Sequence, residues 1–113
     1  MRKIEAIIRK SKFKEVKLNL IEEGFSSFSY LLTRCISKAS EKRFYRGVEY
    51  DSKASERVSL SLYVNYKDLS RALSIITDSG STGDASDCFV NVLEVSESYQ
   101  IQGGEKDTLK NIQ

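Results

Sequence analysis

Two segments of the chain alternate apolar and polar side chains in strict succession. Residues 57–64 read RVSLSLYV, and one set of alternate positions is entirely apolar: Val58, Leu60, Leu62 and Val64. Residues 2–9 show the same period, with Ile4, Ala6 and Ile8 in phase. Successive side chains of a strand point to opposite faces, so a period of two predicts strands with one buried face. Both segments are therefore predicted to be strands of a sheet that is covered on one side.

Two other segments carry the spacing of amphipathic helices. The first lies between Ser11, a predicted N-cap, and Gly24, a predicted stop, with the apolar stripe Phe13, Val16 and Leu20. The second begins after a predicted N-cap, Asn65, has Asp68 in its first turn and ends at Gly80. Its apolar stripe is Leu69, Ala72, Leu73 and Ile76.

The remaining elements are predicted from aromatic and branched residues. Residues 25–36 and 88–95 are expected to be strands, with a short fifth strand near residues 99–102. The order strand–helix–strand, repeated once, predicts an α+β, ferredoxin-like fold: an antiparallel sheet with both helices on one face. The length fits a single domain, residues 1–113. The bare sheet face is expected to be covered by oligomerisation.

One long segment between the two halves has no clear period. Residues 37–56 exceed the roughly 12–15 residues beyond which loops in compact domains are usually functional or disordered. Within them, FYRGVEY contains Tyr45, Arg46 and Tyr50, residue types that contribute strongly to protein interfaces, and Gly47, which permits a positive φ at a turn. Two interpretations stay open: the segment folds back onto its own domain, or it docks on another protein.

Composition argues against several classes of function. A net charge of +2 is too small to indicate nucleic-acid binding. The chain contains no histidine, which removes imidazole catalysis and the commonest metal ligand, and no nucleophile–base pair is visible. We therefore expect no catalytic residues and no metal site. Cys35 and Cys88 lack metal-ligand spacing and are expected to be buried free thiols. The absence of a long apolar run or a secretory signal predicts a cytoplasmic protein.

Several stretches resemble the PII signal-transduction proteins, which are trimeric sensors of nitrogen status. MRKIEAIIR resembles their first strand, and YRGVEY is similar to their T-loop signature, Tyr-Arg-Gly-Ala/Ser-Glu-Tyr, with Val48 as the one departure. The run from Ser79 through Gly83 and Asp84 to Cys88-Phe89-Val90 resembles their B-loop and the following strand. Gly104-Glu105 stands where the family has Thr-Gly-Glu. The resemblance covers nearly the whole chain.

The resemblance implies a homotrimer with small-molecule sites in the clefts between subunits. It also implies that a T-loop, residues 37–56, regulates a membrane transporter or a metabolic enzyme. In the family the signature arginine, here Arg46, can plug an ammonium channel, and the last tyrosine, here Tyr50, is uridylylated in some members. Val48 replaces the serine that other members phosphorylate. The partner-binding residues implied are Tyr45, Arg46, Gly47, Glu49 and Tyr50.

The nucleotide site departs from the family pattern. The B-loop, residues 80–87, lacks the second glycine and the lysine of Gly-Asp-Gly-Lys, and Gln100 and Gln102 replace two arginines ahead of the tail at 103–113. The T-loop glutamine that helps to hold magnesium and 2-oxoglutarate has no clear counterpart. A hydrogen bond to a charged group contributes about 1.5–3 kcal/mol, so three lost cations predict a loss of roughly 4–9 kcal/mol for a triphosphate. Micromolar ATP binding would become millimolar or weaker.

Other positions that match the family's ligand contacts, or adjoin its cleft, are retained. They are Ile7, Ser29, Cys35, Arg57, Gly83 and Asp84. These predict weak ATP binding, or binding of a less charged ligand such as ADP, AMP, a cyclic nucleotide or bicarbonate, with Arg9, Lys10, Arg34 and Lys38 as candidate compensating cations. The register also places Cys35 and Cys88 near the cleft between subunits, which raises the hypothesis of a redox link.

Two functions follow from this reading. The first is a PII-like regulator controlled by a small effector. The alternative is a trimeric protein-interaction module that has lost ligand binding.

Overall fold

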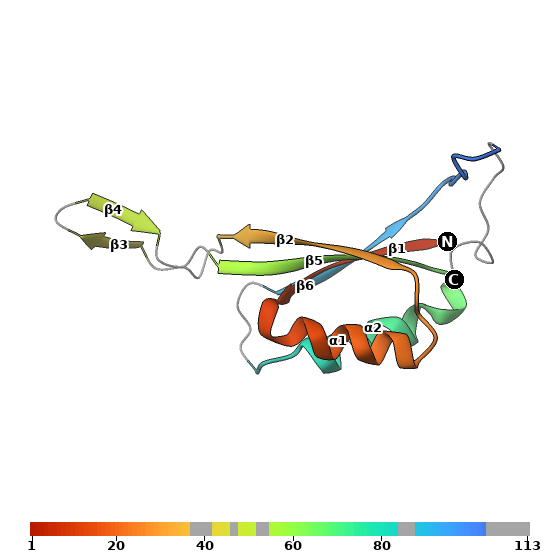
Figure 1. Cartoon of the computed structure of the whole chain (residues 1–113), viewed down its shortest axis with the longest axis horizontal. Coiled ribbons are helices and arrows are strands. Elements are labelled where there is room, and N and C mark those ends of the chain that lie inside the picture. Colours follow the sequence, from red (N-terminus) through yellow and green to blue (C-terminus); the bar gives the residue numbers. More distant parts are fainter. Residues whose placement is uncertain (37–41, 46–47, 52–54, 84–87, 104–113) are drawn as a thin grey trace.

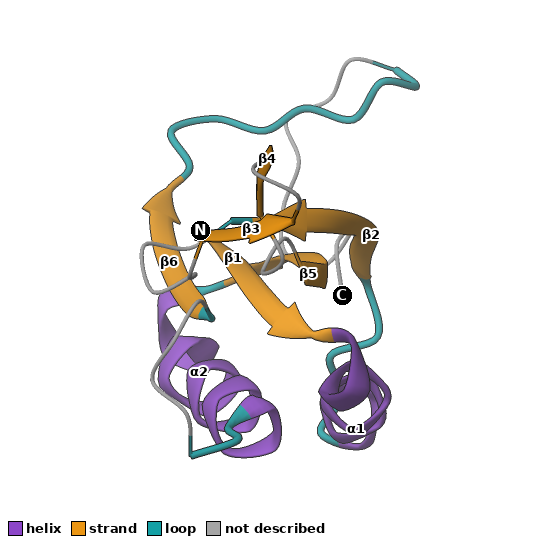
Figure 2. Cartoon of the chain, turned by 90° about the vertical axis from the view of Figure 1, so that its left-hand side faces the viewer, coloured by secondary structure: helices purple, strands orange, loops and turns teal. Residues whose placement is uncertain are grey.

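A computed structural model describes residues 1–36, 42–45, 48–51, 55–83 and 88–103. Four strands form one sheet in the order β2-β5-β1-β6, and every neighbouring pair is antiparallel. Both helices pack on one face of this sheet, as Figures 1 and 2 show. The ferredoxin-like prediction is confirmed. The elements are β1 (Arg2–Arg9), α1 (Lys10–Glu22), β2 (Phe28–Cys35), β5 (Ser55–Val64), α2 (Tyr66–Gly80) and β6 (Phe89–Glu94).

The strand register explains how the alternating pattern builds the core. Ile4, Ala6 and Ile8 of β1 lie opposite Leu62, Leu60 and Val58 of β5, and all six side chains are buried. Directly opposed residues of antiparallel strands project from the same face, so these positions form the floor on which the helices pack. The helices and their connections add the rest of the buried cluster: Val16, Leu20, Phe25, Ala72 and Ile76, together with Val64 of β5.

The end of α1 follows the prediction and its beginning does not. Gly24 has a φ of +91°, and its N–H donates to the Ile21 carbonyl while that of Phe25 donates to the Leu20 carbonyl at 2.9 Å. This is the Schellman arrangement, in which a left-handed glycine ends a helix. The predicted cap Ser11 is wrong, because β1 runs directly into α1 and Arg9 holds the N-cap position without a side-chain hydrogen bond.

Both predicted boundaries of α2 are confirmed. The Asn65 side chain accepts a hydrogen bond from the Asp68 N–H at 2.8 Å, and the helix continues to Gly80. Two contacts then join α2 to α1 and to the segment that follows it. Asn19 Nδ2 donates to Ser79 Oγ at 2.7 Å, and the Arg71 guanidinium lies 4.3 Å from the centre of the Phe25 ring.

Two strand predictions need correction. β2 begins at Phe28 rather than at residue 25, because Phe25 is drawn into the core beneath the helices, where it is 1% exposed. The fifth strand expected at 99–102 is replaced by an isolated bridge at Tyr99 and a turn at residues 101–103. These residues lie beyond β6, where Figure 1 shows the chain leaving the sheet.

The segment expected to lack regular structure contains two short strands. β3 (Lys42–Tyr45) and β4 (Val48–Asp51) pair antiparallel in a sheet of their own, and β5 begins at Ser55, inside the predicted loop. Figure 1 shows this hairpin projecting from the end of the four-stranded sheet rather than joining it. Among the described residues, no helix is long and apolar enough to cross a membrane.

Candidate ligand sites and the projecting hairpin

The face of the sheet opposite the helices is a mixed polar and apolar surface. Ser61 of β5 lies between Glu5 of β1 and Ser29 of β2, and each of these pairs projects from this face. Large apolar side chains flank the polar strip on the two edge strands: Leu31 is 62% exposed and Phe89 is 52% exposed. Exposed apolar patches of this kind are typical of surfaces that contact another molecule.

Lys3 and Glu5 form an ion pair on the same face. Their Nζ and Oε1 atoms are 2.9 Å apart. The hydrogen bond to Glu5 raises the pKa of the Lys3 ammonium group above its ordinary value of 10.5. Both side chains are accessible to water, where such pairs contribute little to stability.

Two arginines face one another where the sheet runs toward the hairpin. Arg9 ends β1 and lies directly opposite Arg57 of β5, which is itself opposite Thr33 of β2. Arg57 is only 7% exposed, and its Nη1 donates to the Glu56 carbonyl at 3.0 Å. A guanidinium group is well suited to bind a carboxylate or a phosphate. This arginine pair is therefore an electrostatically suitable place for a small anion.

The acidic neighbour of Arg57 is already held by another cation. Lys10 Nζ lies 3.1 Å from Glu56 Oε2. The hydrogen bond and charge of Lys10, with a smaller contribution from Arg34, lower the pKa of the Glu56 carboxyl below its ordinary value of 4.5. This pair links the beginning of α1 to the beginning of β5.

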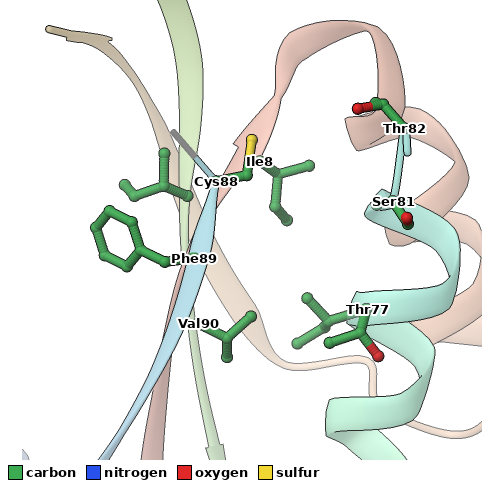
Figure 3. A pocket seen from close by; sticks show the side chains of 10 residues that line it. Ile8, Thr77, Ser81, Thr82, Cys88, Phe89 and Val90 are labelled. Atoms are coloured by element: carbon green, nitrogen blue, oxygen red, sulfur yellow. The ribbon is translucent and has the colours of Figure 1, made fainter. Parts of the chain in front are cut away.

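A cavity of about 420 Å³ lies between the C-terminal end of α2 and the beginning of β6. Figure 3 shows Ile8 and Val90 pointing from the sheet toward α2, whereas Phe89 points to the other side. On the helix side the wall is made by Thr77, Ser81 and Thr82. The Thr77 hydroxyl donates to the Leu73 carbonyl at 2.9 Å, so its oxygen remains available as an acceptor.

The predicted ligand residues do not all meet at this cavity. Ile7 lines it, and Gly83, with a φ of +78°, directly follows the lining residue Thr82. Ser29 lies on β2, and Arg57 belongs to the arginine pair. Asp84 lies outside the described residues.

The cysteines differ from the expectation. Cys35 is half-buried and Cys88 is exposed, so the prediction that both are buried is wrong, although neither forms a disulfide. Cys35 ends β2 and Cys88 precedes β6, at opposite edges of the sheet. Three strand spacings of about 4.8 Å separate those edges, roughly 14 Å, and a disulfide needs Cα atoms within about 7 Å. A redox link within one chain is therefore excluded.

Three of the predicted partner-binding residues lie on the hairpin strands. Tyr45 of β3 pairs with Val48 of β4, while Glu49 and Tyr50 pair with Phe44 and Arg43. Arg46 and Gly47 lie outside the described residues.

The fold and these features define a class: a ferredoxin-like α+β protein with a projecting hairpin between its two halves. Comparison with known proteins narrows the class. No protein-family model matches the chain. The chain is 32% identical over 106 residues to nitrogen regulatory protein P-II 1 of Methanothermobacter thermautotrophicus, covering 93% of this chain and 92% of that protein.

Two further relatives agree with this result. Nitrogen regulatory protein P-II of Cyanidium caldarium is 31% identical, with 93% of this chain and 94% of the relative covered. The protein of the same name from Synechocystis is 28% identical, with 96% and 97% covered. The chain belongs to the nitrogen regulatory protein P-II family, which confirms the resemblance found in its sequence motifs and makes it a nitrogen regulatory signal-transduction protein.

Sequence reasoning did not identify the cavity wall. The pattern of the sequence predicts strand positions for Ile8 and Val90 and gives Thr77 and Ser81 no role, whereas all four line the cavity. The signal in the sequence is positional: only residues 81–88 join the end of α2 to the beginning of β6, which limits how far apart the two elements can lie. The sequence predicts Arg9 as a candidate cation, but its pairing with Arg57 follows only from the strand register.

Proposed function

We propose that the chain forms a homotrimer, binds a small effector in the clefts between subunits, and regulates a membrane transporter or a metabolic enzyme through the β3–β4 hairpin. The projecting hairpin carries this proposal. A signature similar to that of the family's T-loop, YRGVEY, includes Tyr45 of β3 and the first three residues of β4. A strand pair that extends away from the core is well placed to contact another protein.

The arginine pair supports an anionic effector. Arg9 and Arg57 are two guanidinium groups at the end of the sheet nearest the hairpin, so an anion bound there would lie between the core and the docking segment. A monophosphate such as AMP, or bicarbonate, needs fewer cationic contacts than ATP. This fits the sequence, which lacks the B-loop lysine of the family and has Gln100 and Gln102 in place of two arginines. We propose no catalytic role, since the relatives are named as regulatory proteins. The cytoplasmic location remains a prediction.

The sheet face that the helices leave uncovered supports the proposed homotrimer. Three copies arranged about a common axis would cover the exposed Leu31 and Phe89 side chains and create clefts at the edge strands. Light scattering coupled to size-exclusion chromatography is expected to give a mass of three chains. A mass of one chain at micromolar concentration would refute the trimer.

Docking through the hairpin is tested by recovering partners from native membranes and cytosol with the full chain. The double variant Arg46→Ala/Tyr50→Ala is expected to lose at least tenfold of the partner recovered by the wild type, since arginine and tyrosine are the commonest interface hot spots. The matched control, Lys14→Ala/Tyr66→Ala, removes one cation and one tyrosine from exposed helix positions and should recover the wild-type amount. Equal recovery by both variants would contradict hairpin docking.

A ligand-insensitive interaction module is the second candidate, and the altered B-loop sequence favours it. Calorimetric titration with ATP, ADP, AMP and bicarbonate separates the two functions. Heat of binding from any of the four supports the sensor, and silence from all four supports the module.

A further inference from the structure

We propose that the cavity between α2 and β6 binds an uncharged small molecule and disfavours phosphorylated ones. The proposal goes beyond the proposed function, because it adds a separate site for a neutral ligand to the anion site at the arginine pair. Its volume of about 420 Å³ lies within the range of small-molecule sites, about 300–1,000 Å³. The cavity lies on the helix side of the sheet, whereas the arginine pair projects from the opposite face.

The first argument is the chemistry of the wall. Every lining residue that the structure describes is uncharged: one part is aliphatic, and the other carries hydroxyl groups or a thiol, while the Phe89 ring points away. Ile8, Ile76 and Val90 supply the apolar part, and Thr77 and Ser81 supply hydroxyls at the end of α2. An anion transferred to such a wall loses hydration that no cation of the described wall replaces, whereas a neutral molecule can place its apolar surface against the sheet and its polar groups against the hydroxyls.

The second argument is the direction of α2. Thr77, Gly80 and Ser81 belong to or cap the C-terminal end of this 15-residue helix, so the negative end of the helix dipole faces the cavity. No basic side chain lies in the last turn to offset it. A phosphate group prefers the opposite end of a helix, where N–H groups point outward. The wall and the helix end therefore both disfavour an anion, while the apolar half of the cavity disfavours a strongly hydrated cation.

A matched ligand series isolates the charge. Adenosine, AMP, ADP and ATP share one apolar ring system and differ in their phosphate groups. Titration of the full chain, followed through the methyl NMR signals of Ile8, Ile76 and Val90, is expected to show that adenosine shifts these signals and that AMP binds at least about threefold more weakly. No methyl shift with adenosine, or equal or tighter binding of AMP or ATP at these methyl groups, would overturn the proposal.

A single charge placed in the wall should reverse the preference. Ser81→Lys adds an ammonium group at the C-terminal end of α2, where a cation is also favourable for the helix, so the variant should fold. It is expected to raise the affinity for AMP relative to adenosine by about tenfold, as one charged hydrogen bond allows. The control Ser70→Lys adds the same charge at an exposed position of α2 outside the wall and should leave the ratio unchanged. An unchanged ratio in Ser81→Lys would contradict the location.

The outcomes are distinguishable from failure of the proposed function. Trimer mass and hairpin-dependent partner recovery do not depend on ligand charge. If those hold while the adenosine series fails, the regulator stands and the ligand class assigned to this cavity is wrong.

Discussion

Substitution of alanine for glycine should change the free energy of unfolding in opposite directions at Gly24 and Gly80, which end α1 and α2. Gly24 has a φ of +91°, and a Cβ added there meets no atom within 4 Å, so the penalty comes from the backbone alone. Holding an L-residue in the left-handed region costs about 1–2 kcal/mol. Gly80 is helical, and its added Cβ would lie 3.7 Å from Val16 Cγ2 and 3.9 Å from Ile8 Cγ2, which are ordinary contacts. Alanine there should raise the free energy of unfolding by up to about 1 kcal/mol.

Thermal unfolding at one fixed protein concentration measures both changes, since an oligomer's melting temperature depends on concentration. For a chain of this size about 1 kcal/mol corresponds to roughly 3–6 °C. Gly24→Ala is expected to melt about 3–12 °C below the wild type, and Gly80→Ala up to about 6 °C above it. The reasoning is refuted if both variants shift in the same direction, or if Gly24→Ala melts with the wild type while its NMR spectrum stays native.

Two further predictions concern the ends of α2 and α1. Asn65→Ala removes the side chain that accepts the Asp68 N–H and should cost about 1 kcal/mol in urea unfolding, whereas Asn65→Asp keeps an acceptor and should cost much less; equal losses would contradict the cap. Lys10 lowers the pKa of the Glu56 carboxyl below its ordinary value of 4.5. The stabilisation from this ion pair is therefore complete at pH values above 4.5 and is lost as the pH falls through the lowered pKa. NMR titration of the Glu56 carboxyl should show this low pKa returning toward 4.5 in Lys10→Met, and an unchanged pKa would exclude Lys10 as the cause.

The fold was predictable where local and tertiary preferences agree. For α2, the cap Asn65 and the apolar stripe point to the same boundaries, and the structure has them. For α1, the rule of a polar N-cap failed because β1 continues directly into the helix, so the strand's last residue, Arg9, takes the cap position. Strands of four residues, such as β3 and β4, are too short for a period of two to stand out.

The sites were less predictable than the fold because they depend on register and on distant residues. Arg9 and Arg57 are 48 positions apart, and only the β1–β5 pairing makes them neighbours. The cavity wall combines Ile8 with residues near 80 and 90, and no local pattern connects these three parts of the chain. Motif resemblance identified the family and the hairpin signature, but the electrostatic character of the cavity required the orientation of α2.

Because β3 and β4 form a sheet of their own, their hydrogen bonds are not extended by the strands that hold the core. A pair of strands of this length is marginally stable in isolation. Residues of the hairpin can therefore be exchanged during evolution with little effect on whether the rest of the chain folds. New protein targets can then be acquired while the four-stranded sheet and its two helices stay unchanged.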